Sequence, residues 1–425
     1  MQEINYPFYN EKCYFEELPN GLKVYVFHKP EYTSSAVAFG TPYGALDIHQ
    51  SFKGQHYDFN PGIAHFLEHK AFEVKGVDMI DDFAKLGASV NAFTSNRETV
   101  YHFSMTGKEN FFTTLNLLLD MVQTFEISEA SVAKEKPIII EEISMYAERP
   151  ITKLLNETNK ALYHNFPMKY DIGGDTDSVN AISKEELERC YALNYHPSNM
   201  VVSIVSFLDP KEIIETIKAN QAAKNYQRQE LAVSDNEVEP KEVVAKNVNF
   251  EMDVQSAKYV YAIKLNLDTK DDLELVKIQY AIRFYLEICF SAMNPNYQVW
   301  RNNGLINDFF GYEVEVENDF ACILFYSEMQ GAAKLKELVD EVLKTYKTPL
   351  TKFEQLKRRY IGDFFDEFND LDNYNTTFIR NILDGVNMFD IFEIINNLSY
   401  EEMIGLFNTL DLSNYSLVEL KPKNA

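Results

Sequence analysis

Two histidines and a glutamate in the segment His65-Phe66-Leu67-Glu68-His69 have the residue types and spacing needed to bind and use a metal ion. Successive residues of an α-helix are rotated by about 100°, so His65 and His69 share one face, one turn apart. Two imidazoles in that position can bind one tetrahedral zinc ion. With His65 set at zero, His69 falls at about 40° and Glu68 at about 300°, so the carboxylate flanks the metal on the edge opposite to the glutamate of an HExxH motif.

This arrangement favours hydrolysis. Zinc lowers the pKa of a bound water toward neutrality, and a nearby carboxylate can accept the proton while the hydroxide attacks a peptide carbonyl. We therefore predict Zn²⁺ as the cofactor, His65 and His69 as two of its ligands, and Glu68 as the general base.

A catalytic zinc usually has three protein ligands and one open position, so a third ligand is needed. The segment KEKPIIIEEISMYAERP offers three carboxylates on a probable helix, those of Glu135, Glu141 and Glu142. Glu135 and Glu142 are seven residues apart and share one face, whereas Glu141 points about 100° away from Glu142. The spacing alone does not choose among the three.

The elements around these residues indicate an α+β fold. The first stretch, LPNGLKVYVFHKPEYTSSAVAFGTPYGA, is typical of paired strands. After Pro61-Gly62, apolar spacing predicts two short helices, the second ending at Gly87. The segments SVNAFT and TVYHFSMT alternate like a β-hairpin, and longer helices are expected over about 108–125 and up to Tyr146. We expect a mostly antiparallel sheet with helices packed on one face.

The order of elements repeats in the second half of the chain. A strand, KYVYAIKLNL, precedes a helix ending in LEICF, a hairpin of RNNGLINDFFGYEVEV and ACILFYSEMQ, and a long helix, KLKELVDEVLKTY. The segment FLEHKAF has a counterpart, YLEICFS, that lacks both histidines. We predict an N-terminal zinc-bearing domain over 1–221, a polar linker over 222–247, and a homologous C-terminal domain over 248–425 without the zinc motif, the two forming a clamshell.

Composition narrows the class of protein. The net charge of −25 argues against nucleic acid as a partner, because phosphate binding requires clustered Lys and Arg. No apolar run approaches the roughly 18 residues that cross a bilayer, so no membrane association is expected. The opening segment, MQEINYPFYNEKCYFEE, has no signal-peptide pattern, which predicts a cytoplasmic protein. The four cysteines are far apart in sequence and are interpreted as small buried hydrophobes.

Taken together, these motifs resemble those of the pitrilysin-type (M16) zinc peptidases, or inverzincins. The resemblance covers nearly the whole chain and is strongest for the two-domain bacterial, processing-peptidase-like subfamily. It is carried by LPNGLKVYV, GIAHFLEHKAFE, GASVNAFTSNRETVYHF, EKPIIIEEISMY, IGGDTDSVNAISKEELERCYALNYHPSNM and RNNGLI.

The resemblance implies specific roles. It makes Glu142 the third zinc ligand and Glu135 a supporting carboxylate, in agreement with their shared face. It implies that extended substrate pairs with the edge strand carrying Asn91, Ala92, Phe93 and Thr94.

The second half of the family pattern commonly supplies an Arg and a Tyr that hold the substrate and its oxyanion. Arg301 matches the Arg, but Asn307 stands where the Tyr is expected.

We therefore expect a metalloendopeptidase that cleaves short or unfolded peptides. One alternative is a weakly active or non-catalytic peptide-binding subunit of a heterodimer, which Asn307 favours and the intact HxxEH motif disfavours. Another is a dedicated maturation protease for one precursor peptide. The assemblies we expect are a homodimer, or a heterodimer with a homologous subunit.

Overall fold

The chain folds into two units, each drawn from separated stretches of the sequence, in a computed structural model that describes residues 1–423. The first unit contains Met1–Ser144, Tyr170–Asn236 and Phe365–Gly385. The second contains Met145–Lys169, Glu237–Phe364 and the described residues from Val386 onward. The predicted bounds of 1–221, 222–247 and 248–425 follow sequence order, whereas these units exchange two segments. The division of the chain into domains at 1–221, 222–247 and 248–425 remains a prediction.

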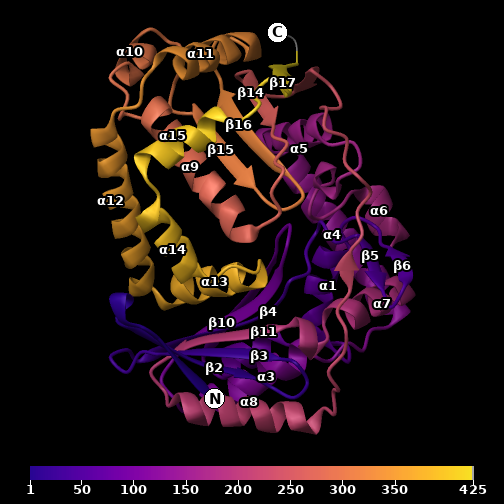
Figure 1. Cartoon of the computed structure of the whole chain (residues 1–425). Coiled ribbons are helices and arrows are strands. Elements are labelled where there is room, and N and C mark those ends of the chain that lie inside the picture. Colours follow the sequence, from indigo (N-terminus) through magenta and orange to yellow (C-terminus); the bar gives the residue numbers. More distant parts are fainter. Residues whose placement is uncertain (424–425) are drawn as a thin grey trace. The chain divides into compact units, whose positions relative to one another are not determined.

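The first unit is built on a seven-stranded sheet, drawn in Figure 1. Its strand order is β1-β2-β3-β11-β4-β10-β9, and every neighbouring pair is antiparallel except β3 with β11. The mostly antiparallel sheet of the predicted α+β class is therefore confirmed. The strands are β1 (Gln2–Tyr6), β2 (Glu11–Glu17), β3 (Lys23–His28), β4 (Ser34–Thr41), β9 (Ala88–Thr94), β10 (Thr99–Thr106) and β11 (Val201–Ser206).

One face of this sheet carries the main core of the first unit. Side chains alternate along a strand, so Val37 and Phe39 of β4 point to this core. The helices that contribute buried residues to it are α1 (Ile63–Ala71), α2 (Ile80–Lys85), α3 (Phe111–Val122), α4 (Glu129–Ala147), α6 (Thr176–Ala181), α7 (Lys184–Asn194) and α8 (Pro210–Ala223). The predicted hairpin 88–106 and the helices on either side of it are confirmed.

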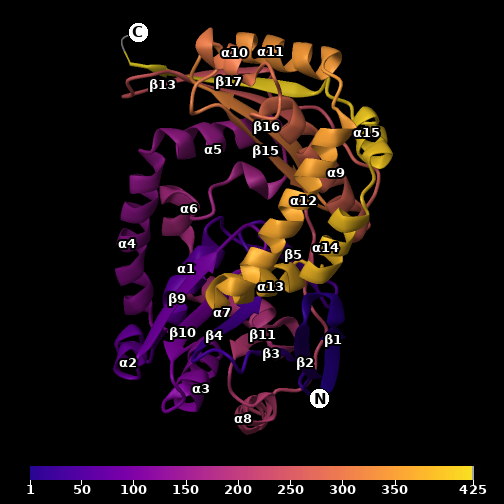
Figure 2. The same ribbon diagram turned by 90° about the vertical axis from the view of Figure 1, so that its left-hand side faces the viewer.

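The opposite face of the same sheet is covered by a helix from late in the sequence, α13 (Leu371–Leu383). Its Ile379 and Leu383 pack on Ala38, Val100 and Val201. A Cβ built at position 40 would lie 2.7 Å from Cδ1 of Leu383, so the glycine of β4 permits this close approach. Figures 1 and 2 show α13 on the side of the sheet away from α3 and α8.

The second unit has a five-stranded sheet with the order β13-β17-β14-β16-β15, in which only β13 and β17 are parallel. Its strands are β13 (Asn247–Met252), β14 (Lys258–Lys264), β15 (Gly311–Val316), β16 (Ala321–Ser327) and β17 (Tyr415–Pro422). Its helices are α5 (Pro150–Leu162), α9 (Asp272–Phe290), α10 (Tyr297–Asn302), α11 (Ala332–Thr345), α12 (Leu350–Asp366), α14 (Met388–Asn397) and α15 (Tyr400–Asn408).

The two units are structural repeats of one another. The strand order β3-β11-β4-β10-β9 of the first corresponds to β13-β17-β14-β16-β15 of the second, including the parallel pair. Helix α1, which carries the histidines, corresponds to α9. Each unit contributes one helix to the other. Helix α5 follows α4 in sequence but packs on β17 and β14 of the second unit, and α13 follows α12 but packs on β4 and β11 of the first. The repeat expected from sequence is present in the fold.

The predicted linker 222–247 is partly ordered into a sheet. Within it, β12 (Val233–Ser234) pairs with β5 (His49–Phe52), which pairs with β6 (Gln55–Asp58). The four cysteines, all of them among the described residues, are buried and unpaired. None of the helices in residues 1–423 is long and apolar enough to cross a bilayer.

Candidate metal centre

Helix α1 holds His65 and His69 in fixed positions because its other face is buried. Phe66 and Leu67 are 0% and 1% exposed and anchor the helix in the core. The helix begins after Gly62, whose φ of +91° is a left-handed conformation that glycine adopts easily. A Cβ there would lie 2.3 Å from the carbonyl oxygen of Gly173, so the helix start also packs directly on a loop backbone.

Glu142 of α4 faces both histidines. Its Oε2 lies 3.8 Å from Nε2 of His65 and 3.4 Å from Nε2 of His69. One donor atom from each of these three residues lies within 4.8 Å of the others. Two ligands bonded to one tetrahedral zinc at 2.0–2.1 Å stand about 3.4 Å apart, so the three donors fit a single ion with small side-chain adjustments. Glu141, its neighbour in sequence, is exposed and is not in this group.

Glu135 lies about two turns before Glu142 on the same face of α4 and contacts the other ring nitrogen of His69. Its Oε1 lies 3.1 Å from Nδ1 of His69, and its Oε2 accepts a hydrogen bond of 3.1 Å from Nζ of Lys70. Lys70 is only 1% exposed and also pairs with Glu73. The carboxylate thereby fixes the ring so that Nε2 points toward Glu142, which is how outer carboxylates orient metal-binding histidines.

The protonation of the two imidazoles reflects these neighbours. Burial, followed by the proximity of His69, lowers the pKa of His65 to about 4, so His65 is neutral at pH 7. Burial is the largest single influence on His69 and would lower its pKa, but the hydrogen bond with Glu135 and the nearby negative charges of Glu135, Glu68 and Glu142 together outweigh burial and raise the pKa. The same hydrogen bond is the main cause of the lowered pKa of Glu135. Neutral imidazole is the form that binds a metal.

Glu68 lies beside the three donors but is not one of them. Its Oε2 accepts a hydrogen bond of 2.6 Å from the hydroxyl of Thr94. Burial raises the pKa of Glu68, and the Thr94 hydrogen bond opposes that change without cancelling it. A partly buried carboxylate with a raised pKa is suited to general-base chemistry near neutral pH.

The strand that contributes Thr94 is the outermost strand of the seven-stranded sheet. β9 pairs only with β10 among the sheet's strands, and α1 packs beside it. Asn91 is exposed, whereas Ala92, Phe93 and Thr94 are partly buried. An edge strand has unpaired backbone groups that an extended peptide can bind.

Arg301 and Asn307 belong to the second unit. Arg301, near the end of α10, pairs with Asp308 at 2.6 Å. The amide nitrogen of Asn307 donates to Oε2 of Glu328 at 3.0 Å. The role of Arg301 in holding substrate remains a prediction.

Several supporting residues were missed by the sequence analysis. Lys70 follows the HxxEH motif directly and lies on the buried side of an amphipathic helix. A charged residue at such a position indicates a buried ion pair, and this pattern could have identified Lys70 from the sequence. Gly173 is a second such residue, because a Cβ there would lie 2.5 Å from Cγ2 of Ile143 and 3.6 Å from Nδ1 of His65. This glycine lets the loop pack between α1 and α4.

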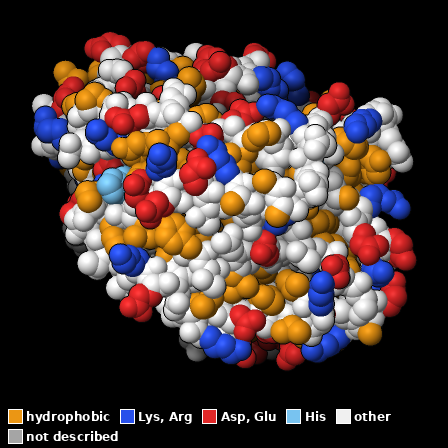
Figure 3. All heavy atoms as spheres, turned by 90° about the horizontal axis from the view of Figure 1, so that it is seen from below, with side chains coloured by type: hydrophobic (Ala, Val, Ile, Leu, Met, Phe, Trp, Pro, Cys, Tyr) orange, Lys and Arg blue, Asp and Glu red, His pale blue; other side chains and the backbone are white. Residues whose placement is uncertain are grey.

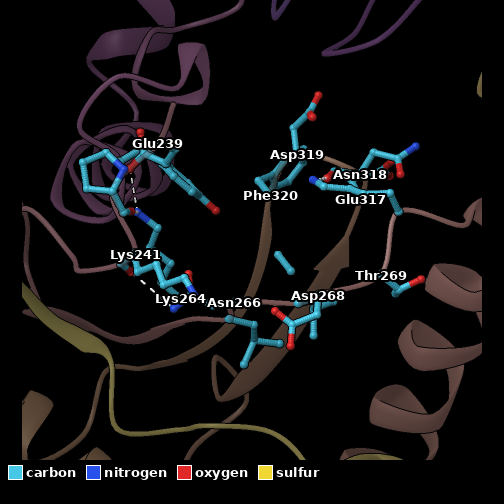
Figure 4. Close-up of a pocket in the computed structure, with 16 residues that line it drawn as sticks. Glu239, Lys241, Lys264, Asn266, Asp268, Thr269, Glu317, Asn318, Asp319 and Phe320 are labelled. Carbon is cyan, nitrogen blue, oxygen red and sulfur yellow. Dashed lines mark hydrogen bonds and ion pairs between the residues drawn. The ribbon is translucent and has the colours of Figure 1, made fainter. Parts of the chain in front are cut away.

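A separate pocket in the second unit, of about 190 Å³, is shown in Figure 4. At its edge the amine of Lys264 donates to Oε1 of Glu239 at 2.6 Å and to the carbonyls of Leu162 and Pro240 at 3.0 and 2.8 Å. Glu239 in turn accepts from the backbone NH groups of residues 164–166. The hydrogen bonds of Lys264 and Glu239 connect α5, the chain around residues 239–240 and β14. We therefore interpret these two residues as structural.

Comparisons with known proteins agree with the geometry of the first unit. Residues 54–176 match the family model for insulinase (peptidase family M16), and residues 181–357 match the model for the peptidase M16 inactive domain. The uncharacterized zinc protease YmfH of Bacillus subtilis is 32% identical over 407 residues, 95% of each chain.

A crystal structure of a putative M16-like peptidase from Alicyclobacillus acidocaldarius superposes with a TM-score of 0.89 at 27% identity, covering 99% of this chain and 100% of that one. A probable mitochondrial-processing peptidase subunit beta of Arabidopsis thaliana is 25% identical over 47% of this chain and 37% of its own length.

Proposed function

We propose that this chain, which belongs to the peptidase family M16, is a zinc-dependent endopeptidase acting on short or unfolded peptides. The observation that carries the proposal is the convergence of His65, His69 and Glu142 on one point, with Glu68 beside them as a non-ligand. A donor set of two imidazoles and one carboxylate is one that catalytic zinc uses.

The proposed reaction divides the work among these side chains. When zinc is bound, it supplies Lewis-acid chemistry that makes water a nucleophile at neutral pH. The carboxylate of Glu68 accepts a proton from the attacking water and delivers it to the leaving nitrogen. Glu135 and Lys70 keep the ring of His69 in place. The backbone of β9 from Asn91 to Thr94 aligns the substrate as an added strand, and Arg301 is proposed to hold the substrate.

Pairing through backbone groups supports extended peptides as the substrate class. It requires little of the substrate's side chains, but it requires a segment free of its own secondary structure. A dedicated maturation protease would add strong side-chain selection, for which the described residues offer no specific observation.

The principal competing function is a non-catalytic or weakly active peptide-binding subunit. Its support is Asn307, which stands where the resemblance implies an oxyanion-stabilising Tyr. Assembly as a homodimer or with a homologous partner, and a cytoplasmic location, remain predictions from sequence.

The deciding experiment uses the full-length chain and a mixed pool of unstructured peptides, with products read by mass spectrometry. Parent protein, chelator-treated protein and Glu68→Gln are compared, and the zinc content of each is measured. We expect cleavage by the parent alone, with Glu68→Gln reduced by about 10²- to 10⁴-fold while retaining zinc. Undiminished cleavage by Glu68→Gln would exclude this mechanism. A parent that binds zinc and peptide but cleaves nothing would favour the binding subunit.

A further inference from the structure

A second group of metal-binding residues lies on the small sheet formed by β12, β5 and β6. In β5 and β6, His49 is opposite Asp58, and Ser51 is opposite His56. Residues two apart on a strand point to the same face, so all four side chains share one face. The backbone NH of Asp235, just after β12, donates to the carbonyl of His49 at 2.8 Å, which brings Asp235 to this group.

The side chains of this group already contact one another through their metal-binding atoms. Nδ1 of His49 and Nε2 of His56 both lie against the same oxygen of Asp58, at 2.6 and 2.9 Å. The two imidazoles are stacked, with ring centroids 6.5 Å apart and planes inclined by 9°. One donor atom from each of these three residues lies within 4.8 Å of the others.

Asp235 holds the other nitrogen of one ring. Its Oδ2 lies 2.9 Å from Nδ1 of His56 and also accepts a hydrogen bond from Ser51. This repeats the relation between Glu135 and Nδ1 of His69 in the metal centre of α1. In both places a carboxylate fixes the ring so that Nε2 faces the remaining donors, an arrangement that raises the affinity of histidine for a metal.

We propose that His49, His56 and Asp58 form a second binding site for a divalent transition-metal ion such as Zn²⁺, with Asp235 orienting His56. Two imidazoles and one carboxylate favour zinc and its neighbours over calcium or magnesium, which prefer all-oxygen sites. The side chains of His49, His56 and Asp58 are 32%, 49% and 63% exposed, so an ion from solution reaches them directly. Entry of the ion requires the donors to separate to about 3.4 Å, a small movement for exposed side chains.

The site would act as a clip. β12 and Asp235 lie in the last stretch of the first unit before the chain continues into the second at Glu237. The hairpin β5–β6 leads directly into α1, and its end is fixed by Phe59, whose NH donates to the carbonyl of Ile48 at 2.8 Å. A bound ion would therefore fasten residues 233–235 to the hairpin that precedes the catalytic helix. This proposal does not rest on the proposed peptidase activity.

The first test counts metal ions in the full-length chain. Protein stripped by a chelator is titrated with Zn²⁺, and the bound ion is measured by mass spectrometry after desalting. His65→Ala weakens the first site, so the comparison that matters is His65→Ala against His65→Ala/His56→Ala. We expect the second variant to bind one equivalent less, because the second site loses a ligand. His65→Ala/His164→Ala is the control, since His164 is exposed and outside both groups.

Equal zinc in all three variants would overturn the proposal and leave the group as a set of ion pairs. A second measurement follows the clip directly by hydrogen exchange in His65→Ala. Added Zn²⁺ should slow exchange of the amide of Asp235, which donates to His49. Unchanged exchange there, at zinc concentrations well above micromolar, would equally contradict the clip. Retention of the circular dichroism spectrum excludes misfolding as the cause of lost binding.

Discussion

The hydroxyl of Thr94 donates a hydrogen bond of 2.6 Å to Oε2 of Glu68. This contact joins the edge strand β9 to helix α1, which carries His65 and His69. The residue expected to align substrate and the residue expected to move the proton therefore share a hydrogen bond. If substrate displaced the strand, the hydrogen bond between Thr94 and the carboxylate of Glu68 would change as well.

Thr94→Val should shift the pH dependence of cleavage. The hydrogen bond stabilises the ionised form of Glu68 and opposes the raised pKa caused by burial, so its loss raises that pKa further. The base must be ionised to act, and the acid limb of kcat/KM should therefore move to higher pH. Thr94→Ser keeps the hydroxyl and should leave the limb near its original position. Profiles of kcat/KM against pH are measured for the parent and both variants. An acid limb of Thr94→Val that stays at the position of the parent would contradict this link.

Glu142→Ala should lose zinc, whereas Glu141→Ala should retain it. The two residues are adjacent on α4, but only Glu142 faces both histidines. Loss of one of three protein ligands removes most of the affinity of such a site. Zinc is best counted in the His56→Ala background, so that the second proposed site does not contribute. Full zinc in Glu142→Ala would transfer the role of third ligand to another carboxylate.

Glu135→Gln should weaken zinc binding by about 10- to 100-fold without abolishing it. Gln is similar in shape, but it lacks the charge that holds Nδ1 of His69 and neutralises Lys70. The zinc affinities of the parent and the variant are measured by competition titration against a chromogenic chelator. The titration is done at pH 8, because protons then compete little with zinc for His69. Affinity equal to that of the parent would mean that the packing of α1 alone orients the ring.

Arg301→Ala should reduce cleavage while leaving zinc content and thermal stability nearly unchanged. The guanidinium pairs with Asp308, which is itself largely exposed, so the pair contributes little to folding. Arg358→Ala, an exposed arginine on α12, is the control for the loss of one positive charge. Parallel losses of activity and stability in Arg301→Ala would make the residue structural.

Glu315→Gln should stabilise the protein at pH 8 but not at pH 4. Burial, then Glu313 and Glu317, raise the pKa of Glu315 from 4.5 to about 7. The folded state holds this proton more tightly than the unfolded state, so stability falls as pH rises through that interval. A change of one in pKa corresponds to about 1.4 kcal/mol, so the rise from 4.5 to about 7 gives a gain of at most about 3 kcal/mol in the variant. The thermal unfolding midpoints of the parent and of Glu315→Gln are compared at both pH values. Glu354→Gln is the control, because Glu354 is exposed.

The sequence predicted those parts of the site that lie on one element or follow a regular period. His65, Glu68 and His69 share a helix, and Glu135 and Glu142 share the face of another, so helical geometry relates them without the rest of the fold. The choice of Glu142 over Glu141 needed the direction of α4 relative to α1, which local spacing does not contain. For the same reason Thr94 was assigned to substrate alone, since its hydroxyl reaches Glu68 only through tertiary packing.

Contacts between distant segments were not predictable from pattern. The group of His49, His56, Asp58 and Asp235 forms because a polar segment, interpreted as a linker, adds a strand to a hairpin far earlier in the chain. Likewise, nothing in the amphipathic pattern of α13 identifies the sheet face it covers, since several apolar faces of similar width are available. On the outer surface shown in Figure 3, which is seen from below the view of Figure 1, basic side chains are scattered among acidic ones and form no continuous basic patch.

The reciprocal exchange of α5 and α13 sets the order in which the protein can mature during synthesis. Helix α1 and the seven-stranded sheet are complete in sequence by Ser206, but Ala38, Val100 and Val201 stay uncovered until Ile379 and Leu383 leave the ribosome. At that point β17 of the second sheet still remains to be translated or released from the exit tunnel. The nascent chain must therefore carry an open apolar sheet face through most of its translation. A polypeptide ending at residue 221 would keep that face permanently, and with it a tendency to aggregate or to recruit the missing helix from another molecule.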